Sequence, residues 1–67
     1  MVDARGFSSP MPVVMVQKEV KKNAPDTLDV LVDNQCAVDN VTRFANNQGY
    51  NVSVKPDGTD FRLTLKK

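Results

Sequence analysis

The sequence predicts a two-layer α/β sandwich with the element order β-α-β-α-β-β. Two stretches place apolar residues at the three- and four-residue spacing of amphipathic helices, and a compact apolar run between them is typical of a buried strand. The C-terminal part alternates apolar and polar residues on both sides of a turn, which is typical of a β-hairpin. The 67 residues suffice for one small domain, whose core is thin because such a chain buries only about 60% of its unfolded surface.

The N-terminal elements are a short strand and a helix. Residues 2–4 fit the strand, and the helix is predicted from Ser9 to near Asn23. Ser9 is a good N-cap, and Pro10 and Pro12 fall in the first turn, where a missing N–H breaks no helical hydrogen bond. The predicted inner face consists of Val13, Val16 and Val20.

The next two elements are a central strand and a second helix. Residues 28–32 are mostly aliphatic or β-branched, as in strands covered on both sides. Asp33 and Asn34 end this strand and can cap the helix, and Gly49 ends the helix. The predicted inner face of this helix consists of Ala37, Val41, Phe44, Ala45 and Gln48.

The hairpin has one apolar and one polar face. Residues 56–59, Pro-Asp-Gly-Thr, form the predicted turn. Its predicted apolar face consists of Tyr50, Val52, Val54, Phe61, Leu63 and Leu65. Because β-α-β crossovers are right-handed, both helices are expected on one face of a mixed four-stranded sheet, and the polar face of the hairpin meets water.

Composition excludes several kinds of function. The net charge of +1 creates no overall attraction to nucleic acid or to an anionic membrane. The chain has no histidine and a single cysteine, Cys36, which excludes a Ser–His triad, zinc chemistry and an intrachain disulfide. No apolar run is long enough to span a bilayer, and the N-terminus lacks the pattern of a signal peptide. We therefore expect a cytoplasmic domain without a cofactor.

Two loops are candidates for a functional site. In α/β sheets, functional groups gather beyond the carboxyl ends of parallel strands, where helix N-termini point their amides outward. Residues 5–9 and residues 33–36 each lie between a predicted strand and the helix that follows it. If the two strands are neighbours, both loops lie at one edge of the sheet.

The opening of the chain resembles the TusA/SirA/YedF family of small sulfur-carrier domains. That family carries the motif Asp-x-x-Gly-x-x-Cys-Pro-x-Pro. The chain has Asp3, Gly6, Pro10 and Pro12 at the same spacing, with Ser9 at the position of the cysteine. The proline motif is short, but an aspartate and a glycine at fixed distances upstream make it fairly specific.

The resemblance covers essentially the whole chain and extends to a subtype. Residues 30–34, 40–45 and 48–50 look most like the N-terminal domain of YedF-type proteins linked to selenium metabolism. The resemblance implies a fold like the C-terminal domain of translation initiation factor 3. It also implies that residues 1–67 are a single TusA/SirA-like domain, and it leaves open whether that domain is excised from a longer chain with a second, DsrE-like domain.

The implied function is sulfur relay. Family members hold sulfur as a persulfide on the motif cysteine and pass it to partner proteins. The implied partners are a cysteine desulfurase as donor and a DsrE-like domain as acceptor, and the domain is expected to be a monomer. A thiolate at a helix N-terminus is stabilised by unpaired amides and by the helix dipole, which explains a cysteine at this position.

Ser9 removes that chemistry. A hydroxyl cannot hold a persulfide, and the chain has no histidine to activate it, so we expect no sulfur transfer. Three accounts of Ser9 stay open. It replaces cysteine by engineering, it is the natural residue of a member that binds without transferring, or it is a plain N-cap and the motif match is accidental.

The remaining candidates each have a functional and a structural interpretation. Asp3 and Asp33 orient the site or cap their loops, and Arg5 holds an anionic persulfide or a partner's carboxylate, or is simply solvated. Cys36 is a second thiol at the same edge, or a small and partly buried apolar side chain. Two other functions stay open: a protein-interaction or regulatory module without chemistry and, by analogy of fold alone, an RNA-binding domain.

Overall fold

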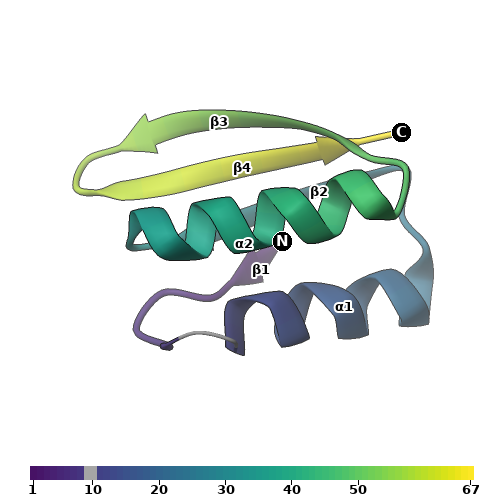
Figure 1. Cartoon of the computed structure of the whole chain (residues 1–67), viewed down its shortest axis with the longest axis horizontal. Helices are drawn as coiled ribbons and strands as arrows, with labels where there is room; N and C mark the ends of the chain where they lie inside the picture. The colour runs from purple at the N-terminus through teal and green to yellow at the C-terminus, as the bar shows by residue number, and fades with distance from the viewer. Residues whose placement is uncertain (9–10) are drawn as a thin grey trace.

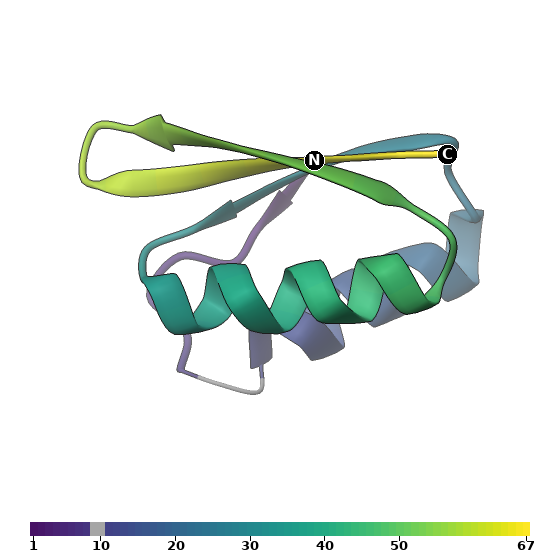
Figure 2. The same ribbon diagram turned by 45° about the horizontal axis from the view of Figure 1, so that its top comes forward.

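The elements follow the predicted order. The computed structural model describes residues 1–8 and 11–67, and these form β1 (Val2–Asp3), α1 (Met11–Asn23), β2 (Thr27–Val32), α2 (Gln35–Asn47), β3 (Asn51–Asp57) and β4 (Asp60–Lys66). Both helices lie under the same face of the sheet, as Figures 1 and 2 show. The predicted two-layer sandwich is therefore confirmed.

The described strands form a mixed sheet in the order β1-β2-β4-β3. β1 runs parallel to β2, with Val2 opposite Val30, whereas β4 pairs antiparallel with both β2 and β3. The predicted strand over residues 2–4 ends one residue early, but the Ala4 N–H still donates to the Leu31 carbonyl at 2.8 Å. Because β1 and β2 are parallel neighbours, the loops that follow them leave the sheet at the same edge.

The two helices cover this sheet with their apolar sides. α1 buries Pro12 and Val16, and α2 buries Ala37, Val38, Val41 and Ala45. Gln48 was expected on the inner face of α2 but is exposed, because it follows the last helical residue and serves as the C-cap. Each helix has 13 residues, and in residues 1–8 and 11–67 no helix is long and apolar enough to cross a membrane.

The apolar face of the hairpin is buried only where a helix lies beneath it. Tyr50, Leu63 and Leu65 are buried as predicted, but Val54 is 43% exposed. In both views the β3–β4 turn extends past the N-terminal end of α2, so neither helix runs beneath this end of the hairpin (Figures 1 and 2). The prediction of a buried Val54 is therefore wrong.

The turn of the hairpin is tighter than predicted. β3 continues through Pro56 to Asp57, which lies opposite Asp60, so Gly58 and Thr59 alone make the turn. Gly58 has a φ of 65°, which a glycine adopts without strain. Pro56 is tolerated because β3 is an edge strand, where a missing N–H need not break a ladder bond.

Candidate functional site

The loops after β1 and β2 are joined by a hydrogen bond. The Gly6 N–H donates to Asp33 Oδ2 at 2.7 Å, across 27 residues of sequence. The other oxygen of the same carboxylate accepts from Asn34 Nδ2 at 2.9 Å. These bonds favour the ionised form, and they lower the pKa of Asp33, with the Gly6 amide as the largest cause. Asp33 therefore fixes the motif loop to the end of β2, and the expected shared edge is confirmed.

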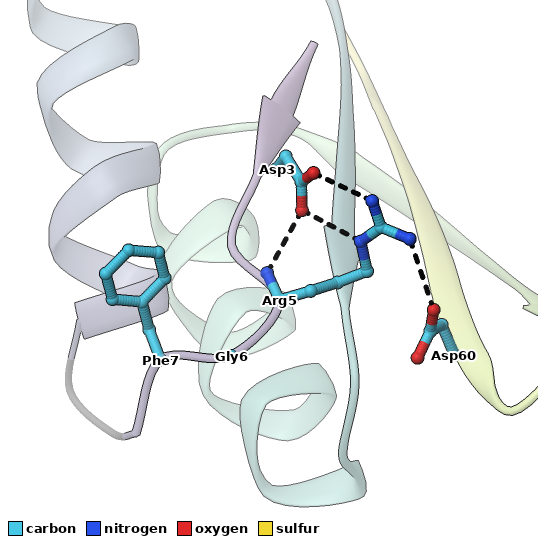
Figure 3. Close-up of a pocket in the computed structure, with 5 residues that line it drawn as sticks. All are labelled: Asp3, Arg5, Gly6, Phe7 and Asp60. Carbon is cyan, nitrogen blue, oxygen red and sulfur yellow. Dashed lines mark hydrogen bonds and ion pairs between the residues drawn. The ribbon is translucent and has the colours of Figure 1, made fainter.

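Asp3 and Arg5 form a tight pair within the motif loop. Arg5 Nε donates to Asp3 Oδ1 at 2.9 Å, and Arg5 Nη2 donates to Asp3 Oδ2 at 2.9 Å, as Figure 3 shows. The Arg5 backbone N–H also donates to Asp3 Oδ1, at 3.2 Å. The side-chain bonds from Arg5 are the largest cause that lowers the pKa of Asp3, to about 2, and the pair raises the pKa of Arg5. Asp3 thus holds both the backbone and the side chain of Arg5.

A third charged residue joins this pair from the hairpin. Arg5 Nη1 donates to Asp60 Oδ2 at 3.4 Å, and Asp60 is the first residue of β4 (Figure 3). Asp3, Arg5, Gly6, Phe7 and Asp60 line a shallow depression at this edge. Arg5 is therefore neither simply solvated nor a free cation, because two carboxylates share its charge.

Asp60 is a site residue that the sequence did not predict. Its position next to Arg5 depends on β4 lying beside β2, and no local pattern reports which strands are neighbours. One signal was available: Asp60 alternates with Phe61 and therefore belongs to the polar face of the hairpin, the face on which Asp3 lies across β2.

The motif itself lies in the turn between β1 and α1. Gly6 has a φ of 81°, which explains a glycine at this position. Pro12 lies in the first turn of α1 and is buried, so it packs as well as fitting the helix start. Ser9 and Pro10 lie outside the described residues, and so do the predicted N-cap role of Ser9 and the predicted first-turn place of Pro10.

Comparison with known proteins identifies the family. The family model described as "Sulfurtransferase TusA" matches residues 1–67. The chain belongs to the TusA family. A Methanocaldococcus jannaschii protein named "putative sulfur carrier protein" is 34% identical over 68 residues, covering 98% of this chain and 91% of its own.

A solved structure supports the same assignment. The crystal structure of a SirA-like protein from Desulfitobacterium hafniense superposes with a TM-score of 0.83 at 27% sequence identity. The match covers 96% of this chain and 90% of the other. The resemblance to the TusA/SirA family is therefore confirmed over the whole chain, and the two-layer α/β fold matches that of the SirA-like protein.

Cys36 in this TusA-family chain is exposed. It lies in the first turn of α2, whose N-cap Asn34 accepts the Ala37 N–H at 2.8 Å through Oδ1. The expectation of a partly buried side chain is wrong, because Ala37 and Val38 take the inward positions of this turn. Cys36 Sγ lies 3.6 Å from Asn40 Nδ2 on the solvent side of the helix.

Proposed function

We propose that the chain is a sulfur-carrier domain of a sulfur relay, with position 9 as the place where the family holds its persulfide. The match of residues 1–67 to the TusA family carries this proposal. The named function of the Methanocaldococcus jannaschii relative supports it. The site consists of Ser9 with Asp3, Arg5, Gly6, Pro10, Pro12 and Asp33 in support.

The chemistry of the relay explains what each part of this site does. A thiolate at the start of α1 is stabilised by the helix dipole and by first-turn amides, of which the Met11 N–H already donates to the Ser8 carbonyl at 3.0 Å and Pro12 has none. In transfer, the thiolate attacks the outer sulfur of a donor persulfide, the donor leaves as its own thiolate, and the sulfur stays on the carrier. A serine at position 9 offers no sulfur to bind, so the chain as it stands does not carry out this transfer.

A second function has one specific observation in its favour. Phe7 is 43% exposed and Met11 is 40% exposed, and in the sequence they lie two residues before and two residues after position 9. Exposed apolar side chains favour contact with a partner protein, whether or not sulfur is transferred. A TusA-family domain with Ser9 can therefore act as an interaction or regulatory module.

We further propose the subtype and the setting of the domain. The pattern of residues 30–34, 40–45 and 48–50 supports a YedF-type, selenium-linked member that works as one monomeric domain beside a DsrE-like domain. A cysteine desulfurase is the proposed donor. An assay with selenium in place of sulfur distinguishes the two elements.

The experiment restores the missing thiol. A Ser9→Cys, Cys36→Ser protein is incubated with a cysteine desulfurase and free cysteine, and its mass is measured intact and after reduction. A reversible gain of one sulfur atom supports the carrier. The unmodified chain and a Cys36→Ser chain are the controls, because Cys36 is an exposed thiol that can itself react.

Three outcomes separate the alternatives. Sulfur on the Ser9→Cys protein and not on the Cys36→Ser control supports the relay. Binding of the desulfurase by all proteins without any mass gain supports the interaction module. Equal gain on the unmodified chain moves the reactive site to Cys36 and refutes the role of position 9.

A further inference from the structure

We propose that Asp60 is a positioning residue of this site: it holds the Arg5 guanidinium between Asp3 at the end of β1 and Asp60 at the start of β4, and so directs the remaining N–H groups of Arg5 at the sulfur or carboxylate of an incoming partner. This inference rests on the proposed function for its role in sulfur transfer. The contact between Asp60 and Arg5 is independent of that function.

The contact joins two parts of the chain that are far apart in sequence. Arg5 and Asp60 are 55 residues apart and meet at 3.4 Å between Nη1 and Oδ2. The Asp60 side chain is 27% exposed, compared with 46% for Arg5 and 51% for Asp3. Asp60 is thus the least exposed of the three side chains, and it lies on β4, whereas Asp3 and Arg5 belong to the N-terminal segment.

The geometry restricts the guanidinium in a way that Asp3 alone does not. Asp3 binds the Nε and Nη2 side of the group, and it belongs to the same segment as Arg5. Asp60 binds Nη1 from β4, so the group is held between two elements (Figure 3). An arginine has five N–H donors, and three of them are used in these contacts. One N–H on each Nη remains for a partner.

The charges indicate how Arg5 acts. One guanidinium between two carboxylates leaves a local charge of −1, so the cluster does not attract anions over a distance. The cluster instead supplies N–H donors of Arg5 that act at hydrogen-bond distance. The direction of these donors depends on both carboxylates. Loss of Asp60 should therefore weaken the encounter with the sulfur donor without changing the chemistry of the thiol.

The functional test uses the Ser9→Cys, Cys36→Ser protein as substrate of a cysteine desulfurase. Asp60→Asn keeps the shape of the side chain and removes its charge. It should raise the KM for the carrier about two- to fivefold, as expected for an exposed charge pair, with kcat unchanged. Asp57→Asn is the matched control, because Asp57 is the exposed cross-strand neighbour of Asp60, and it should leave both constants unchanged.

A second background tests whether Asp60 acts through Arg5. With Arg5→Ala already present, Asp60→Asn should have no further effect on KM, since the group that it positions is gone. An equal effect in both backgrounds would overturn the proposal.

A spectroscopic measurement tests the contact without any sulfur transfer. A guanidinium held on both sides rotates slowly about its Nε–Cζ bond, so Arg5 should give separate Nη signals in nitrogen NMR. Asp60→Asn should speed the exchange between them, because only the Asp3 pair then restrains the rotation, and Asp57→Asn should not. Unchanged signals in Asp60→Asn would refute the positioning role, even if transfer occurs. If the carrier takes up no sulfur, the proposed function fails, and these signals alone decide whether Asp60 holds Arg5.

Discussion

Val32→Ala tests the core at the point where β2 reaches the site. Val32 is 0% exposed, faces the helices and lies opposite Phe61. The change removes two buried methyl groups, which costs about 1.6 kcal/mol of transfer free energy at about 0.8 kcal/mol per group. A cavity of about 40 Å³ that does not collapse adds about 1 kcal/mol. We expect a loss of about 1.6 kcal/mol if the cavity collapses and about 2.6 kcal/mol if it does not, from a total of roughly 3–10 kcal/mol for a domain of 67 residues.

Urea denaturation followed by circular dichroism measures this loss, provided that the slope of the transition stays constant. Val54→Ala is the control, because it removes the same atoms from the helix-side face of the sheet at a position that is 43% exposed. It should change the unfolding free energy by less than about 0.5 kcal/mol. A loss below about 0.5 kcal/mol for Val32→Ala, or equal losses for both variants, would refute the assignment of the core.

Three further predictions concern the loops and caps. Asp3 should titrate with a pKa of about 2 in carbon NMR, and Arg5→Met should return the pKa to near 3.8; no shift on removing Arg5 would contradict the ion pair. Because folding lowers this pKa, the pair stabilises the fold fully above about pH 4, and the stabilisation is lost as the pH falls through 2. Asn34→Ala should lower the unfolding free energy by about 1 kcal/mol in thermal melts, through loss of the α2 cap, and an unchanged melt would exclude that cap. Gly58→Ala should cost about 1–2 kcal/mol because of its left-handed backbone, while Thr59→Ala should be nearly neutral; equal costs would rule out the backbone as the cause.

The fold was predictable because each element carries its own periodic signal. The valines of α1 and the alternation in β4 identify their elements locally, and the crossover rule supplies the arrangement of the layers. The exposure of Val54 was not predictable in this way, since it depends on where α2 begins beneath the sheet. A local pattern specifies which face of a strand is apolar, but not how far the covering helices extend.

The candidate site was predictable only in part for the same reason. The motif glycine and the strand-end aspartate were singled out from sequence, and Gly6 and Asp33 do meet at 2.7 Å. Asp60 was missed because its contact with Arg5 requires the pairing of β2 with β4. The sequence left the exposure of Cys36 open between two interpretations, because at the start of a helix a shift of one residue moves a side chain from the core to the solvent.

The β3 edge of the sheet has features that oppose the addition of a strand from another chain. β3 is an edge strand of seven residues, and its outer backbone groups offer a template on which another chain could add a strand. Pro56 has no N–H, and the charged Lys55 and Asp57 stand on either side of it. A new strand would therefore meet a gap in its hydrogen-bond ladder and two charges near the end of the hairpin. This edge works against association between copies, which favours the monomer that we propose and leaves the carboxyl ends of β1 and β2, where Gly6 and Asp33 meet, as the place for a partner.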